Sequence, residues 1–170
     1  LEQAIAVCRA HLVARHGTPH CRDGETPREA HFAVIAYGKL GGNELSYSSD
    51  LDLVFIHDSR GEAQQTDGDH PVDNQVYFGR LAQRIVHFLN TPTPGGIVYE
   101  IDTRLRPSGN AGLMSTSFDA FAAYQRKTAW TWEHQALVRA RAVAGDPAVC
   151  QAFAALRREI LTQPRERDAL

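Results

Sequence analysis

The sequence predicts an α/β or α+β fold, in which helices shield a sheet of two to four strands. Two apolar runs with the length of buried strands lie at 31–37 and 50–56. Apolar residues spaced three or four apart predict helices before, between and after further strand-like segments. Because strands and helices alternate along the chain, we expect the helices to cover the faces of one sheet.

Composition limits the classes of protein that this chain can represent. Its 170 residues are 43% apolar and 22% charged, which is typical of one globular domain with a sizeable core. The net charge of −2 gives no global positive field, so we expect no nucleic-acid partner. No apolar run approaches the roughly 20 residues of a membrane span, and no export signal is visible, so we expect a cytoplasmic protein without membrane contact.

The first half of the chain divides into two helices and two polar segments around these strands. Apolar spacing predicts a helix over residues 1–15, and the polar stretch 21–29 is expected to be a loop. A second loop is expected at 58–72, where no periodicity is present. A helix is predicted over 73–89, because apolar residues recur at helical spacing and a Pro- and Gly-rich stretch follows.

The second half predicts one more strand and three helical segments. The strand is expected at 97–105. Ser117 can cap a helix that begins at the next residue, and helical patterning resumes through 132–141. A Gly-Asp-Pro break at 145–147 then precedes a last helix. The chain begins with Leu and stops after a helical pattern, so we expect it to be a piece of a longer protein.

A glycine-rich turn joins the two buried strands. Gly38, Gly41 and Gly42 would let backbone amides approach an anion such as a phosphate closely. Asp50 and Asp52 then alternate with leucines, which puts both carboxylates on one face of the second strand. Carboxylate oxygens beside phosphates suit Mg²⁺. The turn and the two acids together predict a metal–nucleotide site.

Two ionised carboxylates side by side are costly without a counter-charge. At about 4 Å and an effective dielectric constant near 20, they repel by about 4 kcal/mol. A bound cation between Asp50 and Asp52 is the simplest remedy. The alternative is a solvated strand face on which both acids pair with Arg or Lys.

The third predicted strand adds charged residues from another part of the chain. Strand alternation would put Glu100, Asp102, Arg104 and Arg106 on one face. Asp102 is a candidate third metal ligand or base, with Glu100 as the alternative, and the arginines are candidate clamps for a triphosphate. The simpler explanation is a surface row of ion pairs, each worth little when exposed.

Several aromatic and charged residues follow in the second half. Trp130 and Trp132 are expected to fill the core, with stacking on an adenine as the alternative. For Glu133, Arg139 and Arg141, a solvated helix face is the simpler explanation, and contact with the nucleotide or the sheet is the alternative. The eight histidines are expected at the surface or at helix caps.

The succession of strand, glycine turn and D-x-D resembles the nucleotidyltransferase superfamily built on the DNA polymerase β palm. More narrowly, GKLGGNELSYSSDLDLVF, YEIDTRLRPSGNAG and AYQRKTAWTWEHQALVRARAVAGD resemble the glutamine synthetase adenylyltransferase family, also called the adenylyl-removing enzyme. The resemblance covers roughly residues 31–160. It implies an α+β fold, a polymerase β-like palm with a small mixed sheet flanked by helices. It also implies a catalytic domain over 1–145, including the N-terminal helix. Residues 146–170 would then begin a helical segment that leads to a further helical domain.

By position, the resemblance implies that Asp50, Asp52 and Asp102 are the metal-binding, catalytic acids. Lys39 departs from the Gly or Ser of the superfamily but matches the narrower family. Together with the turn glycines and the arginines of the third strand, the expected nucleotide contacts are Gly38, Lys39, Gly41, Gly42, Ser49, Arg104 and Arg106.

The resemblance also implies a reaction and its partners. Family members have two nucleotidyltransferase halves, one that transfers AMP from ATP to a tyrosine of glutamine synthetase and one that removes it by phosphorolysis. This chain is more similar to the adenylylating half, which implies Mg²⁺ as cofactor, ATP as co-substrate, glutamine synthetase as protein substrate and the PII signalling protein as regulator. The alternatives are the phosphorolytic half and a noncatalytic nucleotide-sensing module.

Overall fold

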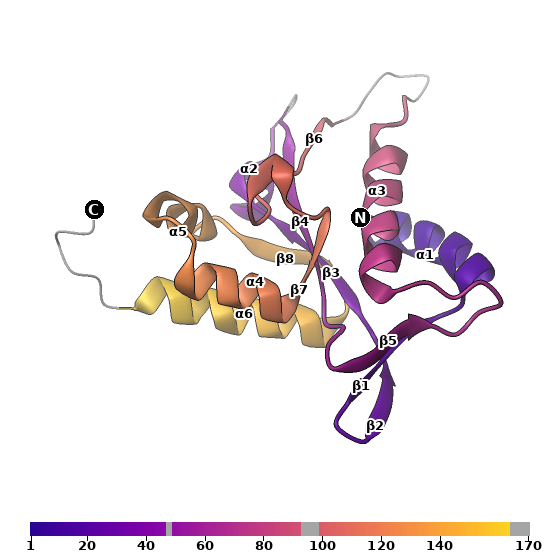
Figure 1. Ribbon diagram of the computed structural model, residues 1–170. Coiled ribbons are helices and arrows are strands. Elements are labelled where there is room, and N and C mark those ends of the chain that lie inside the picture. Colours follow the sequence, from indigo (N-terminus) through magenta and orange to yellow (C-terminus); the bar gives the residue numbers. More distant parts are fainter. Residues whose placement is uncertain (47–48, 93–98, 164–170) are drawn as a thin grey trace.

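The computed structural model describes residues 1–46, 49–92 and 99–163. The central sheet runs between two groups of helices, and a smaller sheet lies at one end (Figure 1). In chain order the elements are α1 (Glu2–His16), β1 (Pro19–Asp23), β2 (Thr26–Glu29), β3 (Phe32–Ala36), α2 (Gly38–Gly41), β4 (Leu51–His57), β5 (Glu62–Thr66), α3 (Asn74–Asn90), β6 (Ile101–Asp102), the 3₁₀ turn η1 (Gly109–Ala111), β7 (Ser115–Ser117), α4 (Phe118–Lys127), α5 (Thr131–Leu137), β8 (Arg141–Gly145) and α6 (Pro147–Thr162).

The central sheet has the strand order β6-β4-β3-β8, with β7 also paired to β4. Strand β3 runs antiparallel to β4 and β8, whereas β6 and β7 run parallel to β4. The predicted α+β fold with a small mixed sheet flanked by helices is therefore confirmed. The predicted helices at 1–15 and 73–89 are confirmed as α1 and α3, and the Ser117 side chain caps α4 by accepting a hydrogen bond from Ala120 N.

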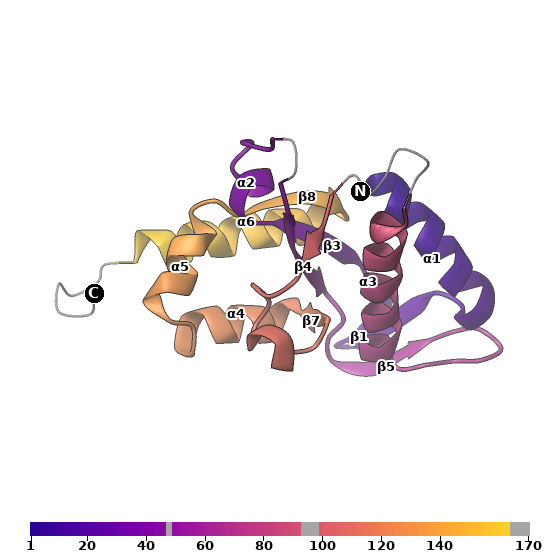
Figure 2. The same ribbon diagram turned by 90° about the horizontal axis from the view of Figure 1, so that it is seen from above.

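Helices cover both faces of this sheet (Figure 2). Leu53 and Phe55 of β4 share a core with α1 and α3. Val54 and Ile56 point to the opposite face, where they share a second core with α4, α5 and α6. Because side chains alternate along a strand, Asp52 lies on the same face as Val54, which is the face covered by α4, α5 and α6.

Helix α6 packs directly on this second face. Its buried side chains Val149, Phe153, Leu156 and Ile160 belong to the same core as those of β3 and β4. Asp146 caps the helix by accepting a hydrogen bond from Ala148 N at 2.8 Å, and Pro147 occupies the first turn. The domain boundary at residue 145 stays a prediction.

Two predicted loops contain strands, so those two predictions were wrong. Strands β1 and β2 form a hairpin that covers most of the expected loop 21–29, and β5 lies within 58–72. The three strands make an antiparallel sheet of order β2-β1-β5. Few side chains of these strands are buried, Cys21 and Thr66 among them. The strands are held by backbone pairing, so their sequences show no alternation of apolar and polar residues that would have predicted them.

Two further predictions fail in the second half of the chain. The strand expected at 97–105 is only β6, Ile101–Asp102, and residues 97–98 lie outside the described part. The helical pattern expected through 132–141 ends at Leu137, and β8 follows. Ala and Arg favour helices, but pairing with the free edge of β3 overrides that local preference.

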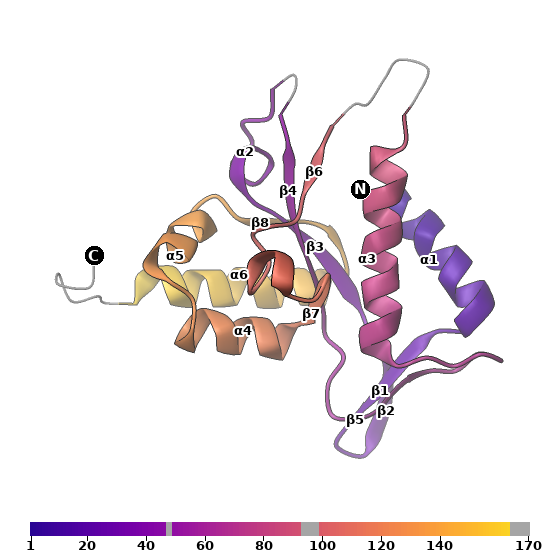
Figure 3. The same ribbon diagram turned by 45° about the horizontal axis from the view of Figure 1, so that its top comes forward.

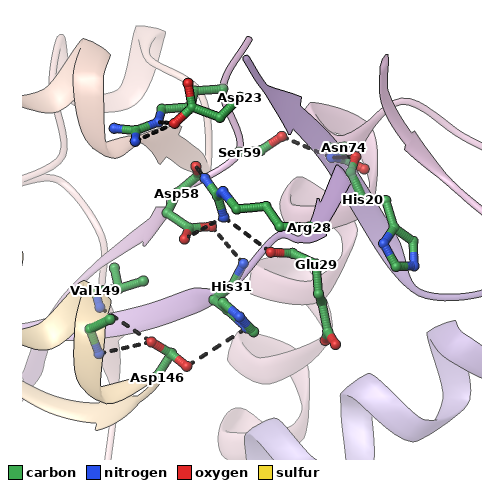
Figure 4. Close-up of polar contacts among 12 residues, drawn as sticks. His20, Asp23, Arg28, Glu29, His31, Asp58, Ser59, Asn74, Asp146 and Val149 are labelled. Atoms are coloured by element: carbon green, nitrogen blue, oxygen red, sulfur yellow. Dashed lines mark hydrogen bonds and ion pairs between the residues drawn. The ribbon is translucent and has the colours of Figure 1, made fainter. Parts of the chain in front are cut away.

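Asp58 joins the two sheets at the end of β4. Its carboxylate accepts hydrogen bonds from the Arg28 guanidinium at 2.8 Å and from His31 N at 2.6 Å. Arg28 also donates to the Asp58 carbonyl oxygen. The His31 ring in turn lies 3.7 Å from the Asp146 carboxylate, so the network runs from the hairpin to the start of α6 (Figure 4).

We predict that Asp58→Ala lowers the free energy of unfolding by about 1–3 kcal/mol, because two partly buried donors lose their acceptor. Urea unfolding followed by circular dichroism measures this change. Asp23→Ala is the matched control, since Asp23 pairs with Arg60 at an exposed site and should cost less than about 1 kcal/mol. Equal losses for the two variants would show that Asp58 does not join the sheets.

His57 is buried in the core, contrary to the prediction that the histidines lie at the surface or at caps. Its ring stacks on Phe78 with centroids 4.6 Å apart. The Gln75 amide nitrogen donates to Ser115 O, so its Oε1 accepts from His57 Nε2 at 3.3 Å. Nδ1 has no partner among the described residues. Burial lowers the pKa of His57 to about 4, against the smaller opposing effect of the Gln75 hydrogen bond.

We predict an acid-sensitive component of stability from His57. The folded state holds this ring neutral between pH 6.5 and 4 whereas the unfolded chain protonates it, so stability falls as the pH drops through this window, by up to roughly 3 kcal/mol. His57→Phe should remove this component from unfolding curves measured at several pH values. His11→Gln, at an exposed position of α1, should retain it. An unchanged pH dependence in His57→Phe would contradict the assignment.

Candidate functional site

Three segments meet at one end of the central sheet. Helix α2 and strand β6 flank the start of β4 (Figure 3). Tyr37 N donates to Asp52 O at 2.9 Å, and Leu51 N donates to Glu100 O at 2.8 Å. Asp52 and Asp102 are partners in register in the parallel pair β4·β6. The two acids therefore come from distant parts of the chain and lie side by side.

Gly38 lies directly against the Asp52 carboxylate. A Cβ atom at position 38 would lie 2.3 Å from Asp52 Oδ2, and the φ angle of 53° is one that only glycine adopts readily. No larger residue fits here without moving Asp52. The first glycine of the turn is thus explained by its contact with an acid of the site.

The charged side chains of the site shift one another's pKa values. Burial raises the pKa of Asp52, and the negative charges of Asp102 and Asp50 raise it further. Hydrogen bonds from Arg104 to Asp102, from the side chain first and from the backbone N at 2.8 Å, lower the pKa of Asp102. Asp50 is exposed and lines a hollow of about 350 Å³ with Asp102 and Arg104. The nearby Arg104 charge offsets these effects only in part, so the pKa of Asp52 stays raised.

The acids supply two of the ligands that a divalent cation would need. Within residues 1–46, 49–92 and 99–163, no three His, Cys, Asp or Glu side chains are gathered closely enough to hold a metal ion. Arg104 occupies Asp102 and is itself largely exposed. Mg²⁺ commonly uses only one or two carboxylates together with substrate phosphates. The pair Asp52 and Asp102, with repulsion that a cation would relieve, supplies such a set of hard oxygen donors.

The later glycines of the turn pack against the chain. A Cβ at Gly41 would lie 1.9 Å from Arg139 O, and one at Gly42 would lie 3.1 Å from Arg139 Nε. Gly41 N and Gly42 N donate to Tyr37 O and Gly38 O within the turn. Close packing against backbone therefore requires glycine at position 41, whereas the contact at Gly42 is tight but involves a flexible side chain. The amides of both glycines are already used.

Arginines of the last third of the chain hold α2 in place. Arg141 at the start of β8 donates to Leu40 O at 3.1 Å and to Gly41 O at 3.3 Å. Arg139 pairs with Glu44 just after α2. Neither explanation considered for these arginines holds as stated, because both residues follow α5 and contact α2 or the residues just after it.

The other sequence-predicted residues bond to other parts of the chain or lie exposed. Arg106 is buried and donates to Thr103 O at 2.7 Å and to the carbonyl oxygens of Asn110 and Gly112, so it braces the segment that follows β6. The strand ends at Asp102, which is why Arg104 and Arg106 do not continue one charged face. Ser49 is buried and accepts a hydrogen bond from Ser46 N at 3.1 Å. Lys39 is exposed on α2.

The two tryptophans are exposed, so the prediction that they fill the core was wrong. Trp130 is 68% exposed and Trp132 is 59% exposed, and both line a cavity beside Arg104. Glu133 accepts hydrogen bonds from the Tyr124 hydroxyl at 2.9 Å and from Trp130 N at 3.1 Å. The sequence pattern did not reveal this cavity, because its lining residues come from four separate segments.

In the part of the chain that the structure describes, no helix combines the length and apolar character needed to cross a membrane.

Comparison with known proteins places these features in a family. Residues 1–156 match the family model of glutamate-ammonia ligase adenylyltransferase. The chain is 56% identical over 170 residues to the bifunctional glutamine synthetase adenylyltransferase/adenylyl-removing enzyme of Thioalkalivibrio sulfidiphilus, and 53% identical over 166 residues to the protein of the same name from Nitrosococcus oceani. These alignments cover 100% and 98% of the chain, but only 18% and 17% of the relatives. The paired acids, the glycine turn and this match over nearly the whole chain lead to one conclusion: the chain belongs to the glutamate-ammonia ligase adenylyltransferase family.

Proposed function

We propose that this chain is a nucleotidyltransferase unit that transfers AMP from ATP to a tyrosine hydroxyl of glutamine synthetase and releases pyrophosphate. The observation that carries the proposal is the in-register pair Asp52 and Asp102 beside the Gly38 turn, in a chain whose relatives are named adenylyltransferases. A polymerase β-like palm is the corresponding fold proposal. It is supported by the glycine turn between two strands and by an acid from a later, parallel strand.

Asp52 and Asp102 would hold Mg²⁺, with Asp50 at the exposed edge of the same cluster. When bound, the cation would offset the negative charge of the phosphates and favour ionisation of the attacking hydroxyl, whose ordinary pKa is near 10. Asp102 is also a candidate to accept the proton of that hydroxyl. The protein would contribute chiefly by holding the two reactants in line and by offsetting charge.

Arg104 is the proposed phosphate contact. Its guanidinium is largely exposed and is tied to the site by Asp102 alone among the described partners, so it can turn to an arriving triphosphate. Lys39 and the amide of Gly38 are further candidates, since the amides of Gly41 and Gly42 are used within the turn. Arg106 would act only indirectly, by bracing the segment that carries Arg104.

The direction of transfer is the finer part of the proposal. The names of the relatives include both an adenylyltransferase and an adenylyl-removing activity, and this chain spans less than a fifth of their length. We favour adenylylation because the motif segments are more similar to that half of the family. Phosphorolytic removal of AMP is the second candidate, and regulation of the whole protein by PII is proposed on the same resemblance.

The deciding experiment offers the chain both possible reactions. With Mg²⁺, glutamine synthetase and ATP labelled on the α-phosphate, we expect label on a tyrosine and release of pyrophosphate. With adenylylated glutamine synthetase and inorganic phosphate, release of ADP in the absence of ATP would instead identify the phosphorolytic unit. Binding of ATP with neither reaction would favour a noncatalytic nucleotide-sensing module.

We predict that Asp52→Asn lowers the rate of AMP transfer by roughly a hundredfold or more, because a metal ligand is lost. The free energy of unfolding should stay equal or rise, since the substitution removes a charge whose burial, and whose repulsion from Asp102 and Asp50, raise the pKa of Asp52. Transfer assays and urea unfolding measure the two effects separately. Asp69→Asn, in an exposed loop, is the control. Near wild-type transfer by Asp52→Asn would exclude the acid pair as the metal site.

A further inference from the structure

A second recognition element lies on the sheet face that carries Asp52. A cavity of about 280 Å³ opens between α4, α5 and the segment that follows β6. Tyr37, the residue after β3, belongs to the core on this face and lines the cavity. The other side chains used in the argument are Tyr124, Gln125, Trp130, Trp132 and Glu133.

The rim of the cavity is aromatic and open to solvent. Trp130 and Trp132, the two tryptophans of the chain, are more than half exposed although large aromatic side chains stabilise a fold chiefly when buried. Exposed aromatic faces beside a cavity are suited to stacking on a flat ring. The cavity is therefore suited to a planar, aromatic ligand.

A buried hydrogen-bond acceptor of a residue that lines the cavity is unused. Gln125 lines the cavity and is 4% exposed, yet its Oε1 accepts no hydrogen bond from any residue within the described ranges. A buried polar atom without a partner costs about 1–3 kcal/mol. Glu133, in contrast, already accepts from Tyr124 and Trp130. A ligand that brings an N–H donor would satisfy this acceptor when the Gln125 side chain turns toward the cavity.

The cavity borders the candidate catalytic acids through Arg104. This residue lines the cavity and donates to the Asp102 carboxylate at 2.8 Å. A ligand seated between the tryptophans would thus lie next to the proposed triphosphate contact. An acceptor tyrosine fits less well here, because its single O–H group has to reach the metal site and cannot also satisfy Gln125.

We propose that this cavity seats the purine base of the nucleotide, with the rim tryptophans stacking on the ring and Gln125 Oε1 accepting from the exocyclic amino group of adenine. The inference rests on the proposed function and names the part of the chain that selects the base. A purine with a carbonyl oxygen at that ring position brings an acceptor instead of a donor, so adenine is preferred over hypoxanthine and guanine.

Tryptophan fluorescence tests the proposal without metal or catalysis, because both tryptophans of the chain lie at the cavity. Adenosine, titrated in the presence of a chelator, should change the emission with saturation. Inosine, which differs from adenosine by an oxygen in place of the amino group, should bind at least about fivefold more weakly. Equal responses to adenosine and inosine, or no response to either, would overturn the base site.

Variants separate stacking from hydrogen bonding. Gln125→Met should remove the preference for adenosine over inosine, and Trp130→Ala should weaken adenosine binding roughly fivefold or more, read from Trp132. Phe88→Ala, at a half-exposed position of α3 on the opposite face, should leave the affinity unchanged. If Gln125→Met does not fold, the comparison of adenosine with inosine in the unaltered chain still tests the base site.

This test is independent of the reaction. Adenosine binding without AMP transfer would leave the base site intact and remove the proposed function. AMP transfer by a chain that binds adenosine and inosine equally well would leave the proposed function intact and overturn the base site.

Discussion

The short parallel pairing of β6 with β4 is the constraint on which the candidate site depends. It joins only Leu51 to Ile101 and Asp52 to Asp102, yet it brings together two acids that are 50 positions apart in the sequence. Neighbouring strands lie about 4.8 Å apart, so two carboxylates in register on one face repel unless a cation or a guanidinium intervenes. In this structure Arg104 relieves Asp102, and Asp52 retains a raised pKa.

The rest of the fold holds that pairing in place from both sides. Strand β4 is buried along its apolar positions between two helical layers, so its register cannot slip without exposing the core. Arg141 and Arg139 secure α2 from β8 and the segment before it, and Arg106 braces the segment after β6. At the far end, Asp58 anchors the smaller sheet. Most charged residues around the site therefore hold parts of the fold together, and few remain available to contact a nucleotide.

The same arrangement places two different kinds of binding surface, a charged one and an aromatic one, on one face of the sheet. The acids lie where β4 begins, and the aromatic cavity lies beyond Arg104 under α4 and α5. Charge dominates the first position, whereas exposed aromatic rings and a single free acceptor dominate the second. A nucleotide has the same division between its phosphates and its base, which is why one ligand can account for both.

The local pattern was enough to predict the elements that bury apolar side chains. The two central strands, α1, α3, α4 with its Ser117 cap, and the last helix all follow from periodicity and capping, because each of these signals lies within a few residues. The turn and the D-x-D motif likewise identified Asp52 and Gly38 as neighbours of one site. What the pattern missed were strands β1, β2, β5, β7 and β8, which are held by backbone pairing with other strands.

Only the tertiary structure decided how individual side chains are used. Gly41 could serve a phosphate or a close packing contact, and the approach of Arg139 from the end of α5 selects packing. Arg106 turns inward because β6 ends at Asp102, and the tryptophans stay exposed because they line a cavity rather than a core. Residue types and short spacings are properties of the chain, whereas the surroundings of each side chain depend on segments that meet only after folding.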